Sequence, residues 1–296
     1  MGGSKTLLFL TFSCQLSTVH YQLFFMLPLL LEPAELAQHL DDDKLLIIDL
    51  SKPAIYVQAH VPGAIHLDFK RLQSGAQPAP GMIPDDDTLS DLFSSLGLTP
   101  DTHVVAYDDE GGGWAGRLLW TLDAIGHKHY SYLNGGIHAW LAEGHPTSSD
   151  SPEPVASDYE VGEHDPLTEV HLDYLLEHHT SPSLALWDSR SEEEYAGVRA
   201  FAQKAGHIPG AIHYEWTDAM DRSNNLRLRP LDDIRAELEA RGITPDKEVI
   251  CHCQTHHRSS FSWLVGKILG YPRLRGYAGS WAEWGNHPDT PVAKPD

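Results

Sequence analysis

The heptapeptide "HVPGAIH" at residues 60–66 recurs, with one residue changed, as "HIPGAIH" at residues 207–213. Two further pairs of similar stretches follow the same order along the chain, residues 98–108 with 243–253 and residues 124–146 with 268–288. All three pairs are separated by nearly one offset, about 145 residues. Matches in one order at one offset predict a tandem duplication of a unit of about 120–130 residues.

Both copies show the same order of expected elements. A short apolar strand ends in Asp at residues 45–49 and 184–188, and a short helix and the PGAIH strand follow it. A second helix then ends at a glycine, Gly97 or Gly242, before the next apolar strand. Strands that alternate with helices predict a mainly parallel sheet with helices on both faces. The expected fold class is therefore α/β, with two tandem domains of this kind.

Composition sets the domain boundaries. The segment between the copies is rich in Pro, Ser, Asp and Glu, which is typical of a linker. The expected divisions are an N-terminal extension (1–26), a first domain (27–147), a linker (148–166) and a second domain (167–296). The apolar runs of the extension are interrupted by polar residues and are short for a membrane span. We interpret it as an extension ahead of the folded domain, with a poor signal peptide as the alternative.

The charge balance limits the partners. The 296 residues include 21 Lys and Arg against 42 Asp and Glu, a formal net charge of −21. Such an acidic chain is not expected to bind nucleic acid or an anionic membrane. Three cysteines do not form a disulfide framework, and this usage indicates a reducing compartment, so we expect a cytoplasmic protein. We also expect a monomer.

The stretch "CHCQTHHRSS" at residues 251–260 lies between an expected strand (247–252) and an expected helix (258–269). This arrangement places Cys253 at the carboxyl end of a parallel strand, where α/β sheets bind ligands. The helix N-terminus and Arg258 should lower the pKa of its thiol, and His256 and His257 could add positive charge. An acidic protein could thereby hold an anionic substrate in one electropositive cup.

Other interpretations of the two cysteines are open. Cys253 could be a buried structural thiol, although its polar loop is an unusual place for one. Cys251 shares a strand face with Val249, so a small core residue is the favoured interpretation, with a redox partner for Cys253 as the alternative. A metal site is disfavoured because no CxxC or HxxxH pair lies elsewhere in the sequence, and no metal is expected.

The length of the loop separates two kinds of chemistry. Phosphatases that form a cysteinyl phosphate place five residues between the cysteine and the arginine of an HC-x5-R loop. Only four residues separate Cys253 from Arg258. The shorter ring offers one amide fewer, which favours a single sulfur atom on the cysteine over a tetrahedral phosphate.

The duplication, the PGAIH strand, the string "HCQTHHRS" and the stretch "YAGSWAEWGNHP" (277–288) together resemble a tandem-domain rhodanese, a thiosulfate sulfurtransferase. The loop is similar to that of a bacterial branch of this family, and it has Thr255 where the thiosulfate branch has Lys. The resemblance implies that Cys253 is the persulfide-forming nucleophile and that no metal or organic cofactor is needed. It also implies a role for Arg190 in binding the anionic donor, with an exposed arginine that caps a turn as the alternative. The other candidate substrate-binding residues belong to the loop: Gln254, Thr255, His256, His257 and Arg258.

Several neighbours of the expected site have supporting roles. We expect Asp188 to order the loop that follows its strand, rather than to act as an acid or base. Trp216, Trp281 and Trp284 are expected to pack around the pocket wall, and Glu215 to line its entrance.

In the first copy, Asp108 occupies the position of Cys253. A carboxylate cannot carry sulfane sulfur, and it would repel an anionic donor. The glycines at 111–113 lack the Lys and Ser/Thr of a phosphate-binding P-loop. The first domain is therefore expected to be catalytically silent.

The expected function is transfer of sulfane sulfur from thiosulfate, or a related donor, to cyanide or a thiol through a Cys253 persulfide. One alternative is a persulfide carrier that delivers sulfur to a partner protein. A cysteine-dependent phosphatase is the other, and the loop length disfavours it.

Overall fold

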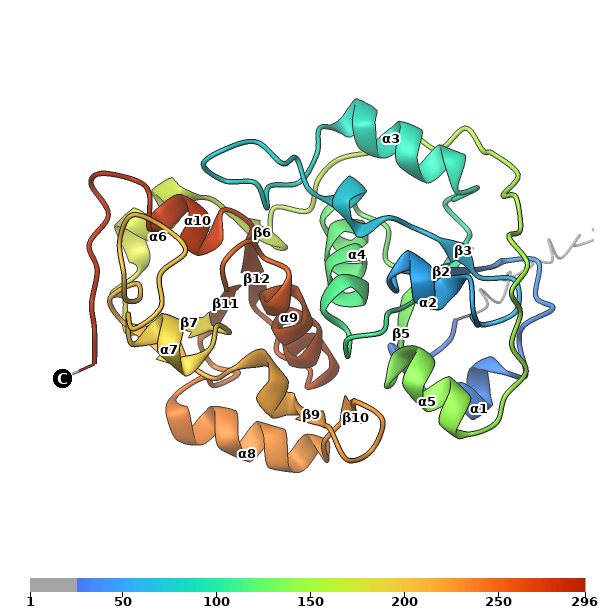
Figure 1. Cartoon of the computed structure of the whole chain (residues 1–296). Coiled ribbons are helices and arrows are strands. Elements are labelled where there is room, and N and C mark those ends of the chain that lie inside the picture. The colour runs from blue at the N-terminus through green and yellow to red at the C-terminus, as the bar shows by residue number, and fades with distance from the viewer. Residues whose placement is uncertain (1–25, 296) are drawn as a thin grey trace, which may run out of the picture.

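The computed structural model describes residues 26–295 of the chain (Figure 1). The extension expected at residues 1–26 lies outside the described residues, apart from Met26. The first five-stranded sheet is parallel throughout and has the order β1-β5-β4-β2-β3. Its strands are β1 (Leu30–Leu31), β2 (Leu45–Asp49), β3 (Ile65–His66), β4 (His103–Tyr107) and β5 (Tyr130–Leu133). Its helices are α1 (Pro33–Leu36), α2 (Pro53–Tyr56), α3 (Asp86–Ser95), α4 (Gly113–Ala124) and α5 (Gly136–Ala142).

The second sheet repeats this topology in the order β6-β12-β11-β7-β8, and it too is parallel throughout. Its strands are β6 (Glu169–Val170), β7 (Leu184–Asp188), β8 (Ala211–His213), β11 (Glu248–His252) and β12 (Leu274–Tyr277). Its helices are α6 (Leu172–His178), α7 (Glu192–Tyr195), α8 (Leu231–Arg241), α9 (Arg258–Ile268) and α10 (Ser280–Trp284). A small antiparallel hairpin, β9 (Met220–Asp221) and β10 (Arg227–Leu228), has no counterpart in the first sheet. The predicted pair of α/β domains is confirmed.

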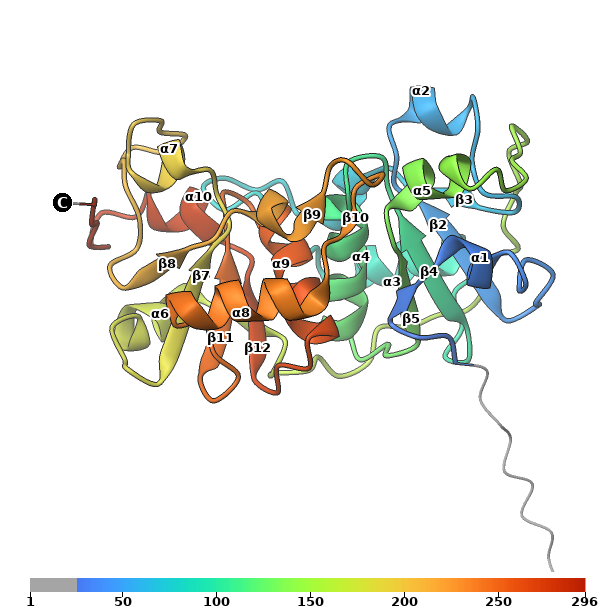
Figure 2. The same ribbon diagram turned by 90° about the horizontal axis from the view of Figure 1, so that it is seen from below.

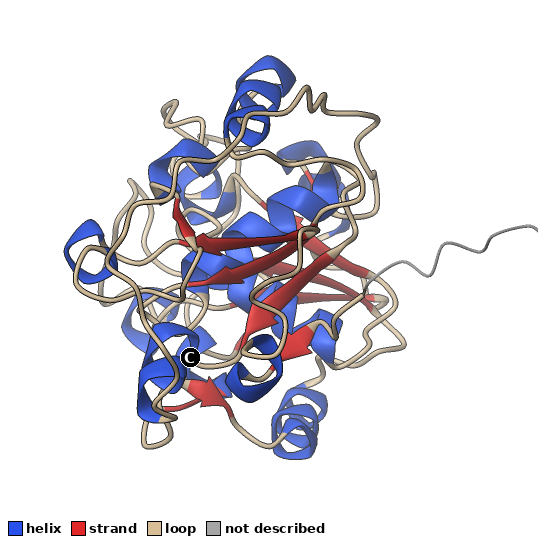
Figure 3. Ribbon diagram, turned by 90° about the vertical axis from the view of Figure 1, so that its right-hand side faces the viewer, coloured by secondary structure: helices blue, strands red, loops and turns tan. Residues whose placement is uncertain are grey.

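The strands are buried on both faces, and alternate side chains enter different cores. In β11, Val249 and Cys251 belong to a large core that both domains share, whereas Ile250 belongs to an outer core with α6 and α10. In β4, Val104 likewise faces the shared core and Val105 faces an outer core with α1 and α5. Figure 3, viewed from the side of the first domain, shows strands lying between helices. Burial on both faces explains why these strands are continuous apolar runs.

Helices α4 and α9 lie against each other at the junction of the two domains, in both views (Figures 1 and 2). Gly116 of α4 permits this approach, because a Cβ atom there would lie 2.9 Å from the backbone nitrogen of Phe261 in α9. Helix α9, which follows the loop that contains Cys253, is thus packed directly on the first domain.

The connection between the domains is fixed along its course although it contains no helix or strand between residues 149 and 165. It passes along α3, where Ser94 Oγ donates to Tyr159 O (2.9 Å) and Ser157 N donates to Ser94 O (2.9 Å). Further on, Asp165 N donates to Ala124 O at the end of α4 (2.8 Å). The Pro-rich connection therefore follows the surface of the first domain closely.

Across residues 26–295, no helix combines the length and the apolar character needed to cross a membrane.

Candidate active site

The candidate catalytic loop leaves the centre of the second sheet. Strand β11 pairs with β7 and β12 and ends at His252, Cys253 follows, and α9 begins at Arg258. The predicted succession of strand, loop and helix is confirmed. Residues 253–257 therefore lie at the carboxyl edge of a parallel sheet, ahead of a helix N-terminus whose first amides have no intrahelical partner.

The sulfur of Cys253 is enclosed by hydrogen-bond donors. The residue is buried, and the Thr255 amide together with the amide and hydroxyl of Ser259 act on its thiol as hydrogen-bond donors that lower its pKa. Burial alone would raise the pKa of the thiol. The Arg258 guanidinium and these donors outweigh that effect, so the pKa of Cys253 lies below its usual value. The sequence indicated Arg258 and the helix N-terminus, but it did not reveal Ser259.

Arg258 is held in place by a carboxylate of the neighbouring helix. Its Nη1 and Nη2 atoms donate to the two Glu194 oxygens at 2.6 and 2.9 Å, which is bidentate geometry. Ser191 caps α7 and forms a capping box with Glu194, which fixes that carboxylate in turn. Burial opposes ionisation of Glu194, but Arg258 outweighs it and lowers the pKa of this carboxyl group. The positive charge beside the sulfur is therefore fixed in position.

Helix α10 holds the loop from the other side. Ser280 Oγ accepts hydrogen bonds from the amides of Cys253 (3.3 Å) and His256 (3.1 Å) and donates to Tyr277 O (2.8 Å). The amide of Trp281 donates to Cys253 O at 2.9 Å. Ser280 has a φ of 51°, an uncommon value for a residue other than glycine. Sequence reasoning missed Ser280, whose only signal is its place in the stretch 277–288.

Gln254 and Thr255 reach neighbouring loops. Gln254 Nε2 donates to Phe201 O at 3.3 Å, within the loop that precedes β8. Thr255 O accepts from Gln73 Nε2 of the first domain at 3.2 Å. The same carbonyl lies so close to Gly81 that a Cβ atom there would be 2.3 Å from it. A loop of the first domain thus covers this part of the candidate catalytic loop.

His256 does not contribute the positive charge expected of it. Burial, followed by the charge of Arg117, lowers its pKa well below the usual value, so the ring is neutral. The ring is fully buried and packs edge-to-face on Trp120 of the first domain, with 4.2 Å between ring centroids. The expectation of added charge from His256 is therefore wrong, because its environment excludes water.

His257 points toward the first domain. Its Nε2 pairs with the carboxylate of Glu110, and its ring stacks on Trp114 with 3.9 Å between centroids. Trp216 lies on another side of the ring, 5.8 Å between centroids. His257 thus joins the loop to the first domain.

Arg190 is buried rather than exposed at a turn, so the exposed-cap alternative is excluded. Its Nη2 and Nε donate to the Asp188 carboxylate at 2.5 and 2.9 Å, and its guanidinium lies over the Trp281 ring at 4.4 Å. Burial opposes ionisation of Asp188, but the adjacent His252 and Arg190 hold its pKa at about 2. Among residues 26–295, Nη1 of Arg190 has no hydrogen-bond partner. Asp188 therefore orders Arg190.

The remaining neighbours named from the sequence lie in different surroundings, and the core position expected for Cys251 is confirmed. Cys251 is buried in the shared core, and burial, followed by the neighbouring Cys253, raises its thiol pKa well above the usual value. Trp281 and Trp284 belong to the outer core of the second domain, whereas Trp216 is half-buried beside His257. Glu215 precedes the 3-10 turn at Trp216–Ala219 and makes no capping hydrogen bond there.

In the first domain, the side chain of Asp108 fills the loop that corresponds to the Cys253 loop. Asp108 follows β4, and its carboxylate accepts five backbone N–H bonds at 2.8–3.0 Å. The donors are the amides of Glu110, Gly111, Gly112, Trp114 and Ala115. Burial and then Glu110 raise the pKa of Asp108 to about 6, and the amide bonds limit that rise. An internal carboxylate thus occupies the anion cup of this domain.

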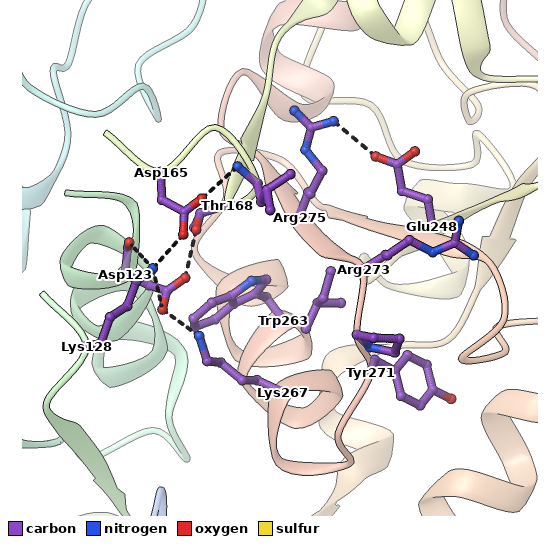
Figure 4. A pocket seen from close by; sticks show the side chains of 13 residues that line it. Asp123, Lys128, Asp165, Thr168, Glu248, Trp263, Lys267, Tyr271, Arg273 and Arg275 are labelled. Carbon is purple, nitrogen blue, oxygen red and sulfur yellow. Dashed lines mark hydrogen bonds and ion pairs between the residues drawn. The ribbon is translucent and has the colours of Figure 1, made fainter. Parts of the chain in front are cut away.

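A cavity of about 450 Å³ between the domains lies at the opposite ends of the strands (Figure 4). Asp123 of α4 and Lys267 of α9 form an ion pair at 2.5 Å in its wall, beside Trp263. Ligands of parallel sheets bind beyond the carboxyl ends of the strands, whereas this cavity faces the amino ends. It is therefore separate from the Cys253 loop. Among the described residues, no group of three or more His, Cys, Asp or Glu side chains is placed to hold a metal ion.

Comparison with known proteins gives one consistent family. The model of the rhodanese-like domain matches residues 32–143 and again residues 171–287. The chain is 53% identical to the thiosulfate sulfurtransferase of Azotobacter vinelandii over 269 residues, which cover 91% of this chain and 98% of that protein.

A second relative and a solved structure extend the comparison. The chain is 34% identical to the sulfur carrier protein TtuD of Thermus thermophilus, covering 87% of this chain and 93% of that protein. The solved structure of YnjE matches with a TM-score of 0.82 at 22% identity, over 90% of this chain and 68% of that one. The last similarity concerns the fold alone.

Proposed function

Because this chain belongs to the rhodanese family, we propose that it moves sulfane sulfur from thiosulfate to cyanide or a thiol through a persulfide on Cys253. Its 53% identity to a thiosulfate sulfurtransferase over nearly its whole length makes it a sulfurtransferase. The observation that carries the residue assignment is the enclosure of the Cys253 sulfur by donors and by Arg258.

The first half of the proposed reaction loads the enzyme. The Cys253 thiolate attacks the outer sulfur of thiosulfate, a bond forms between the two sulfurs, and the bond to the sulfonate sulfur breaks. Its electron pair leaves with sulfite, so the enzyme keeps a persulfide anion and no oxidant is needed. The Thr255 and Ser259 amides and Arg258 stabilise the negative charge that moves to the outer sulfur.

The second half returns the enzyme to its starting state. Cyanide or a thiolate attacks the outer sulfur of the persulfide, and Cys253 leaves as a thiolate. A thiol with a low pKa is a good leaving group, so the environment that activates Cys253 for attack also favours its release.

The donor-binding residues belong to the proposal. Arg190 can offer Nη1 to a sulfonate oxygen, because its other nitrogens are engaged by Asp188 and Gly206 O. Gln254 and Thr255 belong to the loop that contains Cys253, and Arg258 begins α9 directly after that loop. The buried ring of His256 and the paired ring of His257 support a role in holding the loop rather than in contacting the donor.

The first domain is proposed to be catalytically silent. Asp108 replaces the cysteine, Gly113 replaces Arg258 at the start of α4, and Ser51 follows Asp49 where Arg190 follows Asp188. The copy therefore lacks the thiol and both guanidinium groups, and its cup already contains a carboxylate.

A persulfide carrier is the second candidate, favoured by the similarity to a protein named as a sulfur carrier. The carrier would be isolated as a persulfide but would turn over thiosulfate and cyanide very slowly. We further propose a reducing, cytoplasmic setting, which the cysteine usage supports.

Thiocyanate formation from thiosulfate and cyanide tests the proposal. The wild-type protein should turn over, Cys253→Ala should be inactive, and Cys251→Ala should stay active because that thiol is a core residue. An active Cys253→Ala protein would contradict the residue assignment. Hydrolysis of an aryl phosphate by the wild type, lost in Cys253→Ala, would instead support a phosphatase.

A further inference from the structure

We infer that His256 is a positioning residue for Cys253: its Nδ1–H donates to the Ser259 hydroxyl and thereby directs the hydroxyl proton to the sulfur. The inference rests on the proposed role of Cys253 as the nucleophile. It assigns a role to His256, whose ring packs on Trp120 of the first domain.

The direction of the hydrogen bonds follows from the single proton of a hydroxyl group. His256 Nδ1 and Ser259 Oγ are 2.7 Å apart, and both residues are fully buried. The Ser259 hydroxyl is also one of the hydrogen-bond donors that lower the pKa of the Cys253 thiol, and a thiolate is only an acceptor. Since the proton of Ser259 goes to the sulfur, its oxygen must accept at Nδ1, and Nδ1 must carry the ring proton.

The imidazole ring is held so that it cannot rotate away. The amide of His256 donates to Ser280 Oγ at 3.1 Å, and the ring packs edge-to-face on Trp120. Gly276 lies against the other ring nitrogen, where a Cβ atom would be 2.4 Å from His256 Nε2. Arg117 Nη1 also approaches His256 O at 3.4 Å. The first domain, through Trp120 and Arg117, therefore supports this orientation.

The other ring nitrogen explains why His256 positions a proton rather than transferring one. Nε2 is buried and has no hydrogen-bond partner among residues 26–295. Burial and Arg117 hold the pKa of His256 well below the usual range, so the ring keeps one proton at neutral pH. A neutral ring with Nδ1 protonated is a fixed donor.

Two buried neighbours of Cys253, His252 and Asp188, titrate well below neutral pH, so they do not contribute to the profile of thiol reactivity near pH 7. Burial lowers the pKa of His252 to about 4, and Asp188 titrates at about 2. The charged and titratable groups that face the sulfur and its loop are Arg258, Glu194, Asp188, Arg190, His252, Cys251, Arg117, His256 and the His257–Glu110 pair.

The test is the rate of alkylation of Cys253 by iodoacetamide as a function of pH, without any sulfur donor. Mass spectrometry of the peptide 248–258 separates Cys253 from Cys251 through its fragment ions. Ser259→Ala should raise the thiol pKa by about one unit, because a hydrogen bond to a charged group is lost. Ser262→Ala is the matched control, since that hydroxyl is buried in the same helix without a partner.

Two substitutions at position 256 separate the donor from the backbone. His256 has a φ of 52°, which Gly and Asn adopt more readily than other residues. His256→Gly removes the donor without backbone strain and should raise the thiol pKa by about half a unit or more. His256→Asn keeps an N–H group near the position of Nδ1 and should restore much of the wild-type profile.

An unchanged pH profile in folded Ser259→Ala and His256→Gly proteins would overturn the inference. Nitrogen-15 spectra of the wild-type imidazole provide a readout that needs no variant: Nδ1 should be protonated and Nε2 unprotonated, and the opposite tautomer would overturn the inference. Neither measurement depends on sulfur transfer. A failure of Cys253 as the nucleophile would appear separately, as thiocyanate formation by Cys253→Ala.

Discussion

Among the groups that lower the pKa of Cys253, the Arg258 guanidinium has the largest effect, and its removal should change the pH dependence of the first half-reaction. We expect Arg258→Gln, made together with Glu194→Gln so that no buried carboxylate is left unpaired, to raise the thiol pKa. Each unit of that rise means about tenfold less thiolate at a pH below the pKa.

Sulfite release from thiosulfate, measured against pH, checks this expectation. The profile should move to higher pH, because the thiolate is the reactive form and its pKa has risen. Arg241→Gln, at an exposed site on α8, controls for loss of a positive charge. A profile unchanged from the wild type would show that Arg258 does not set the thiolate fraction.

The Asp188–Arg190 pair is fully buried, so breaking it from one side should be costly. Asp188→Asn should lower the free energy of unfolding by about 3–5 kcal/mol, because it leaves a buried guanidinium without its carboxylate. Asp188→Asn combined with Arg190→Met should recover part of that loss. Urea unfolding at pH 7 measures the stability of both variants. A double variant that is no more stable than Asp188→Asn would contradict this expectation.

The contribution of the Asp188–Arg190 pair to stability should depend on pH. The pKa of Asp188 is about 2 in the folded state, below its usual value of 3.8. Its contribution is therefore present above about pH 4 and is lost as the pH falls toward 2. The difference in stability between the wild type and Asp188→Asn should shrink over that acid range.

A small carboxylate from solution should bind in place of the Asp108 side chain when that side chain is removed. Asp108→Ala removes the carboxyl group from five amide donors and should strongly destabilise the first domain. Formate carries the missing carboxylate, so it should raise the melting temperature of this variant more than chloride at the same ionic strength. A formate effect equal to that on the wild type would argue against an anion cup.

At the level of helices, the contact between α4 and α9 depends on a residue without a side chain. Gly116→Ala would place a Cβ atom within 3.0 Å of the α9 backbone, so the helices must separate. We expect a loss of about 1–3 kcal/mol of stability and reduced turnover, because α9 supports the Cys253 loop. Gly162→Ala is the control, since its Cβ would meet nothing within 4 Å. Equal stability of the two variants would contradict the contact.

The longer elements were predictable, and the shortest ones were not. The apolar runs at β2, β4, β7 and β11 and the glycines that end α3 and α8 gave correct elements, and Gly97 and Gly242 have φ values of 80° and 90°. The two-residue strands β1 and β6 carry no periodic signal, because their pairing with β5 and β12 defines them. The short helix expected after the strand at residues 45–49 comprises only Pro53–Tyr56.

Between the domains, the Asp123 carboxylate links both halves of the molecule. It accepts hydrogen bonds from Tyr130 Oη (2.6 Å) and Thr168 Oγ1 (2.7 Å) and pairs with Lys267. Asp123→Asn should lower the free energy of unfolding by about 1–3 kcal/mol. Asp165→Asn, which affects a more exposed pair with Lys128, should change it by less than about 1 kcal/mol.

The effect should also depend on pH. Burial opposes ionisation of Asp123, but Lys267 and the hydroxyl donors outweigh it and lower its pKa. Its contribution is therefore present above the unfolded pKa and disappears as the pH falls below about 4. Chemical unfolding of both variants at pH 7 and in acid checks this, and an equal loss in both variants at pH 7 would contradict it.

The organisation of the whole molecule was partly predictable from the sequence. The repeat predicted two α/β domains, and the lost cysteine at Asp108 indicated which copy is catalytic. The contacts of the first domain with the catalytic loop were not predictable, because Gln73, Trp120 and Glu110 are brought to it only by the packing of α4 on α9. The same packing decides that His256 is neutral and that His257 is paired.

The central claim is that sulfur is carried on Cys253, and the most direct test is the mass of the protein after exposure to thiosulfate. The wild type and Cys251→Ala should each gain one sulfur atom, located at Cys253 by fragmentation, and should lose it when cyanide is added. Cys253→Ala should gain none. A sulfur atom found on Cys251, or one retained by Cys253→Ala, would contradict the account.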